Sequence, residues 1–82
     1  MKTLRKGATG DEVLTLQNLL NEWGFECPPT GTFDENTEKA VRDFQQVQGL
    51  TADGIVGKRT WETLQDETLR ELAPFRLKEA DY

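Results

Sequence analysis

Gly31-Thr-Phe-Asp-Glu-Asn-Thr-Glu-Lys-Ala-Val41 is the stretch that decides the fold, because the chain contains a second version of it. The second copy is Gly54-Ile-Val-Gly-Lys-Arg-Thr-Trp-Glu-Thr-Leu64, and the two align without a gap, 23 positions apart. Each copy reads as a glycine turn, one buried apolar residue, a helix cap and an amphipathic helix. The repeat therefore predicts two turn-to-helix units that pack together.

Helical periodicity and cap residues predict three helices. The first is expected from about Asp11 to Trp23, preceded by a capping box in 9–12 and closed by Gly24. The second is expected to follow an N-cap at Asp34 and to end at Gly49, and the third, shorter helix follows residue 57. The inner face of the second helix is predicted to comprise Thr37, Ala40, Val41, Phe44 and Val47.

The predicted fold class is all-α, a small three-helix bundle with two turn-helix repeats. The extended pieces 32–33 and 55–56 could add a minimal two-stranded pairing at the turns. Gln17 is placed near the edge of the first helix's apolar face. Residues 1–65 are expected to form the domain, and 66–82 a linker and the start of a missing following domain. The predicted core is Leu4, Val13, Leu16, Leu20, Phe33, Val41, Phe44, Leu50, Val56, Trp61 and Leu64.

Composition excludes several classes of function. The 82 residues include ten Lys plus Arg and fifteen Asp plus Glu, and the net charge of −5 argues against nucleic acid and anionic membranes as partners. Cys27 is the only cysteine and histidine is absent, which excludes an intrachain disulfide, a structural zinc site and a Cys-His nucleophile. The first residues lack the apolar segment of a signal peptide.

A series of motifs continues beyond the repeat. It comprises Leu4-Arg-Lys-Gly7, Gly10-Asp-Glu-Val13, Leu16-Gln17, the first copy of the repeat through Phe44-Gln45, Gly49-Leu50 and Asp53-Gly54 with the second copy. In this order and spacing, the chain resembles the three-helix peptidoglycan-binding module of bacterial and phage cell-wall hydrolases. The resemblance covers residues 3–65. One position departs from it: the first turn has Thr30-Gly31, where family members often have Asp-Gly.

The resemblance implies a non-catalytic module that binds peptidoglycan and targets a covalently linked wall hydrolase. No cofactor and no metal are implied, and a monomer is expected. Residues 76–82 are similar to the opening of a muramidase domain, so the expected parent is a modular phage endolysin with this module first. It would act at the bacterial cell wall and, without a signal peptide, reach it by a phage-type route.

The candidate ligand site lies where the two turns meet the helix starts. Peptidoglycan offers acetamido groups, hydroxyls and a stem peptide, and a shallow groove with amides, hydroxyls and an aromatic wall would suit them. Trp61 fits either the core or a partly exposed wall. The candidate residues, several of them positions where the copies differ, are Thr30, Thr32, Asn36, Asp53, Lys58, Arg59 and Trp61.

Two other classes of function can be weighed against the sequence. A glycosidase needs two carboxyl groups across a cleft, and 82 residues leave no second lobe to form one. The alternative to wall binding is a helical protein-interaction module or an inhibitory module like the propeptide of some secreted metalloproteases. In that propeptide a cysteine blocks the zinc, but Cys27 lies in Glu-Cys-Pro-Pro without the flanking residues of such a switch.

Overall fold

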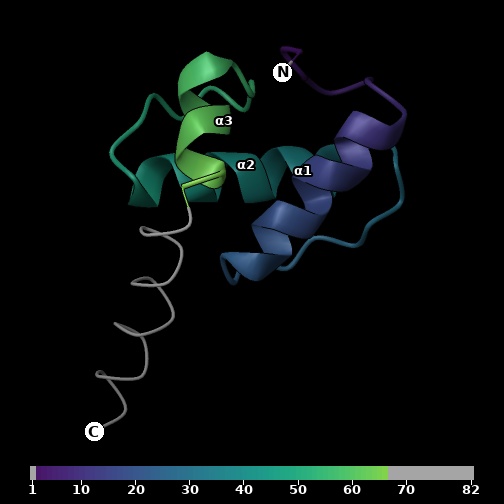
Figure 1. The fold of residues 1–82 in the computed structure, drawn as a ribbon, viewed down its shortest axis with the longest axis horizontal. Helices are drawn as coiled ribbons and strands as arrows, with labels where there is room; N and C mark the ends of the chain where they lie inside the picture. Colours follow the sequence, from purple (N-terminus) through teal and green to yellow (C-terminus); the bar gives the residue numbers. More distant parts are fainter. Residues whose placement is uncertain (1, 67–82) are drawn as a thin grey trace, which may run out of the picture.

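Three helices form the fold, as expected. The computed structural model describes residues 2–66 and contains α1 (Asp11–Glu22), α2 (Glu35–Val47) and α3 (Lys58–Leu64). Figure 1 shows α2 running across the middle of the molecule, with α3 rising from it. In the described part of the chain no helix is long and apolar enough to cross a membrane. The predicted linker and following domain lie outside the described residues, apart from Asp66.

The lead-in, residues 2–10 before α1, forms backbone hydrogen bonds with both repeats. Leu4 exchanges two backbone hydrogen bonds with Val56 (3.0 and 2.8 Å), and the Phe33 N–H donates to Ala8 O at 2.8 Å. A second antiparallel bridge pairs Thr9 with Thr32. Within residues 2–66 the extended pieces 32–33 and 55–56 therefore pair with the lead-in and not with each other, so the pairing allowed by the sequence analysis is wrong.

The start of α1 differs from the expectation. Its N-cap is Gly10, at φ 120°, and no side chain caps the helix. The predicted capping box is therefore wrong, because Thr9 pairs with Thr32 in the bridge. The carboxylate of Glu12 instead accepts from the Lys2 N–H at 3.2 Å.

Both longer helices end in the predicted glycine caps. Gly24 (φ 93°) and Gly49 (φ 76°) take the left-handed conformation that glycine adopts without strain. After α1, the Phe25 N–H donates to Leu20 O at 2.9 Å, and after α2 the Leu50 N–H donates to Gln45 O at 2.8 Å. These are the long hydrogen bonds of two Schellman motifs, and each turns an apolar side chain back toward the core.

The predicted core is confirmed, with Leu50 only partly buried. Trp23 and Cys27 also belong to it, and the Trp23 indole N–H donates to Leu64 O at 3.0 Å, which ties the end of α1 to the end of α3. Val47 was expected inside but is 66% exposed. It lies one turn after the exposed Asp43 on the same side of α2, so periodicity alone misplaced it.

Candidate functional site

A buried glutamine holds each of the two turns. Gln17, fully buried on α1, donates through Nε2 to Thr37 Oγ1 (2.9 Å), the carbonyl of Thr32 (3.1 Å) and Thr30 Oγ1 (3.2 Å). Its Oε1 accepts from the Gly31 N–H at 2.9 Å. One side chain therefore binds several polar groups of the first turn and of the helix start that follows it.

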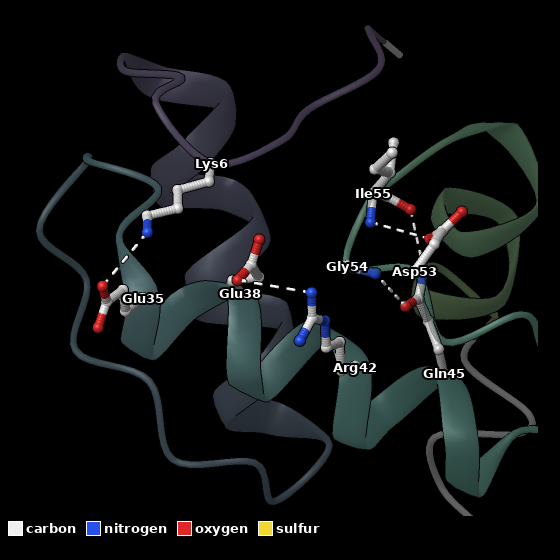
Figure 2. A network of polar contacts seen from close by, with 8 residues as sticks. All are labelled: Lys6, Glu35, Glu38, Arg42, Gln45, Asp53, Gly54 and Ile55. Atoms are coloured by element: carbon white, nitrogen blue, oxygen red, sulfur yellow. Dashed lines mark hydrogen bonds and ion pairs between the residues drawn. The ribbon is translucent and has the colours of Figure 1, made fainter.

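Gln45 repeats this arrangement from α2. Its Nε2 donates to Ile55 O (2.9 Å), Asp53 Oδ1 (3.2 Å) and Thr60 Oγ1 (3.2 Å), and its Oε1 accepts from the Gly54 N–H at 3.0 Å. Figure 2 shows Gln45 reaching from α2 to this turn. The repeated unit is therefore longer than the sequence copies indicate, because each unit includes the glutamine of the preceding helix.

Gly54 lets the second turn lie close against α2. It has φ 77°, and an added Cβ would lie 3.0 Å from Glu38 Cγ and 3.1 Å from Arg42 Nε. Glu38 and Arg42 form an ion pair at 3.8 Å along the helix, shown in Figure 2 beside Gly54. A side chain at position 54 would disturb this approach.

The two helix starts that follow the turns differ in charge. Asp34 caps α2 by accepting from the Thr37 N–H (3.0 Å) and the Thr37 hydroxyl (3.1 Å). The hydrogen bond from the backbone N–H of Thr37 has the largest effect, and together the two hydrogen bonds hold the pKa of Asp34 below its ordinary value. Gly57 holds the corresponding position before α3 and offers no carboxylate. The start of α3 therefore carries the positive side chains Lys58 and Arg59 without an acidic cap.

Four of the seven candidate residues lie around two separate hollows. The first, which we name the turn hollow, has a volume of about 370 Å³ and includes Asp53, Lys58 and Arg59 among its lining residues. The second, the connector hollow, has a volume of about 510 Å³ and lies between the segment after α1 and the side of α2 that carries Asn36. Among residues 2–66, the two hollows have no lining residue in common.

Three candidate residues line neither hollow. Thr30 accepts hydrogen bonds from Gln17 and from the Thr32 N–H, so its hydroxyl shapes the first turn. Thr32 is exposed on the outside of that turn. Trp61 is only 2% exposed and donates its indole N–H to Lys2 O at 2.7 Å. It belongs to the core, and the exposed aromatic wall that the sequence allowed at this position does not form.

The turn hollow is mixed in charge and rich in groups that can form hydrogen bonds. Lys58 and Arg59 are exposed, and within residues 2–66 no ion pair joins either of them to an acidic group. Asp53 is also exposed, but its Oδ1 is engaged with Gln45 and with the Ile55 N–H. The hollow thus offers two free cations beside one carboxylate that is partly used. In the described part of the chain no group of acidic or cysteine side chains could hold a metal ion.

Neither the role of Gln17 and Gln45 as organisers of the site nor that of Phe25 as a lining residue was predicted from the sequence. A signal for the glutamines was present, since Leu16-Gln17 and Phe44-Gln45 both place glutamine directly after a core residue. Phe25 corresponds to Leu50 as the apolar residue after the glycine cap. Aligning the helix ends as well as the repeated stretch would have indicated both.

Comparison with known proteins identifies the family. Residues 9–64 match the family described as "Putative peptidoglycan binding domain". The N-acetylmuramoyl-L-alanine amidase CwlL of Bacillus licheniformis is 38% identical over 64 residues, which are 74% of this chain and 18% of that enzyme. The chain thus spans about a fifth of the length of this curated relative.

Solved structures agree in fold and in sequence. An endolysin of the Burkholderia AP3 phage superposes with a TM-score of 0.78 at 41% identity, over 80% of this chain and 26% of the endolysin. The SleB N-terminal domain superposes with a TM-score of 0.78 at 35% identity, over 82% of this chain and 93% of that domain. From the match across most of its length and from these shared structures, the chain belongs to the peptidoglycan-binding domain family.

Proposed function

We propose that this chain binds peptidoglycan and brings an attached cell-wall hydrolase to its substrate. The observation that supports this most directly is the family match over residues 9–64, together with wall hydrolases as relatives. The chain corresponds to only 18% of the amidase and 26% of the phage endolysin, so the chemistry of those proteins requires more than this module. Binding, without catalysis, is the function that the chain itself contributes.

Binding by this module would raise the effective concentration of the linked hydrolase at its substrate. A module that holds the polymer converts each encounter of the linked catalytic domain with the wall into an intramolecular event. We propose a phage endolysin as the parent, with a muramidase as the linked domain and action at the bacterial wall after a phage-type release. We further propose that the module works as a monomer.

The turn hollow is the proposed site for the stem peptide. Lys58 and Arg59 lie at its edge and form no ion pair with residues 2–66, and the carboxylates of the stem peptide are the anions that peptidoglycan offers to them. Asp53 supplies an acceptor for an amide or amine on the same ligand. The overall charge of −5 makes this local pair of cations more informative, because a general basic surface does not account for it.

Retention on purified, protein-free sacculi tests the proposal. The chain is expected to sediment with sacculi while a helical protein of similar size and charge stays in solution, and equal partition of the two would reject wall binding. Arg59→Ala is expected to weaken retention with an almost unchanged melting temperature. Arg5→Ala removes the same charge from an exposed position outside both hollows and is the matched control. Equal loss in the two variants would reject the turn hollow as the site.

A further inference from the structure

The connector hollow is the counterpart of the turn hollow in the other repeat. Each hollow is bounded by the Schellman motif that ends one helix and by the start of the next helix. Gly24 and Phe25 correspond in this way to Gly49 and Leu50. Asn36, at the other boundary, corresponds to Arg59 by the repeat spacing of 23. The fold therefore provides the same concave element twice, with different side chains in it.

An aromatic ring distinguishes the connector hollow. Phe25 is partly buried and lines it, whereas the described lining of the turn hollow includes no aromatic residue. The backbone of Phe25 is held by its hydrogen bond to Leu20 O, and its ring packs edge-on against Phe44 with a centroid distance of 5.8 Å. A ring fixed in this way offers an apolar surface against which the C–H groups of a sugar ring can pack.

Unused polar groups surround this ring. Asn36 and Lys39 come from α2, and Asp43 follows one turn later on the same side. Glu26 comes from the connector. No hydrogen bond or ion pair engages any of these four side chains within residues 2–66. Together they supply amide, ammonium and carboxylate groups that can donate to or accept from hydroxyl and acetamido groups.

The charge of the lining separates the two ligand classes. Among the described residues, the connector hollow is lined by two carboxylates, Glu26 and Asp43, and one cation, Lys39, whereas the turn hollow is lined by two cations and one carboxylate. A stem-peptide carboxylate would be repelled from the connector hollow and attracted to the turn hollow. A neutral sugar with hydroxyl and acetamido groups avoids this repulsion and uses the fixed ring.

We propose that the connector hollow binds an N-acetylated sugar of the glycan strand, through packing on Phe25 and hydrogen bonds to Asn36 and Asp43. This inference rests on the proposed function and adds a second ligand site to it. The two sites are independent in position, because Gln45, which lines the turn hollow, follows Asn36 by nine positions and so lies about half a turn away around α2. Substitutions at one hollow are therefore expected to leave the other intact.

The test is a titration of the isotopically labelled chain with a β-1,4-linked tetramer of N-acetylglucosamine, followed by amide chemical shifts. Shifts are expected in 24–28 and 36–43 and not in 51–60. Asn36→Ala is expected to raise the Kd about five- to tenfold, and Phe25→Leu to do the same. Leu50 is the natural counterpart of Phe25, so Phe25→Leu keeps the apolar residue of the helix cap and the fold. Arg5→Ala, at an exposed position outside both hollows, is the control and should leave the sugar titration unchanged.

The inference would be overturned by the absence of saturable shifts with the tetramer, or by shifts confined to the turn hollow. An unchanged Kd in both Asn36→Ala and Phe25→Leu would do so as well. Failure of the proposed function is recognised separately, as the absence of retention on sacculi. Retention on sacculi without tetramer binding would reject the sugar site alone, and tetramer binding at the connector hollow without retention would reject wall targeting alone.

Discussion

Thr30 and Asp53 hold the same position in the two turns and accept the same two hydrogen bonds. The Thr30 hydroxyl accepts from Gln17 Nε2 and from the N–H two residues later, both at 3.2 Å. The Asp53 carboxylate accepts from Gln45 Nε2 at 3.2 Å and from the Ile55 N–H at 2.9 Å. An oxygen acceptor at this position therefore shapes the turn, and the threonine of the first turn has the role that aspartate has in the second.

Exchange of these side chains should be tolerated. Thr30→Asp keeps an acceptor for both hydrogen bonds and is expected to change the free energy of unfolding by less than about 0.5 kcal/mol. Thr30→Ala removes the acceptor and is expected to lower it by about 1 kcal/mol. Urea unfolding of the three chains checks this. A loss in Thr30→Asp as large as in Thr30→Ala would show that the turn needs the threonine itself.

Loss of Gln45 should be among the most damaging single changes. Gln45→Leu keeps a similar volume but leaves the Gly54 N–H and the Thr60 hydroxyl without their partner in a buried place. Each buried group left without a partner costs about 1–3 kcal/mol, so we expect a loss of at least about 2 kcal/mol in the free energy of unfolding.

Its neighbour supplies the control for this experiment. Gln46→Leu makes the same chemical change at an exposed position of α2, and a change within about 0.5 kcal/mol is expected there. Similar losses in the two variants would contradict the assignment of Gln45 as the residue that holds the turn.

Local signals predicted the helices well. Gly24 and Gly49 end helices because glycine takes the left-handed conformation without strain, and Asp34 begins one because its carboxylate accepts from free N–H groups. Such signals act within a few residues of each other. They can be recognised in the sequence without knowledge of how the rest of the chain packs.

The buried glutamines were not predicted, for a physical reason. An amide is buried without penalty only where all its polar groups find partners, and the partners of Gln17 come from the first turn and the start of α2, 13 to 20 positions away. Hydrophobic periodicity does not include such long-range pairing, so it placed Gln17 near the edge of the apolar face of its helix. The same limit explains Val47: hydrophobic periodicity places it on the inner face of its helix, but no element within residues 2–66 covers its side chain.

The candidate site was predicted in part. Asn36 and Arg59, equivalent positions in the two copies, were expected in one cluster where the two turns meet the helix starts. In the structure Asn36 lines the connector hollow and Arg59 lines the turn hollow. Equivalence in a repeat thus indicated two related places and not one.

Gly54 should accept no side chain. Its φ of 77° disfavours any residue with a Cβ, and that Cβ would press on Glu38 and Arg42. We expect Gly54→Ala to lower the free energy of unfolding by more than the roughly 1–2 kcal/mol that the backbone conformation alone costs. Gly24→Ala has a similar φ of 93° with open space around the Cβ and should show the backbone cost alone. Equal losses in thermal unfolding would rule out the steric part.

Cys27 should be unreactive in the folded chain. Burial raises the pKa of its thiol, and the side chain is only 1% exposed. Labelling with a thiol-specific reagent at pH 8 is expected to be slow, and to become fast when urea unfolds the chain. Because this is the only cysteine, the labelled fraction reports directly on its exposure. Fast labelling under native conditions would place Cys27 outside the core.

Asp34 should make stability depend on pH in the acid range. Its pKa is lowered in the folded chain by the hydrogen bonds from Thr37, so its stabilising contribution is complete above the ordinary pKa of 3.8. The contribution is lost as the pH falls through the lower, folded value. Asp34→Ala is therefore expected to lower the melting temperature at pH 7, and the difference from the unchanged chain should shrink as the pH is taken below about 4. Glu35→Ala, an exposed acid at the next position, is the control and should show a smaller difference at pH 7. A difference for Asp34→Ala that stays constant between pH 7 and pH 2 would mean that its carboxylate does not act as the ionised cap of α2.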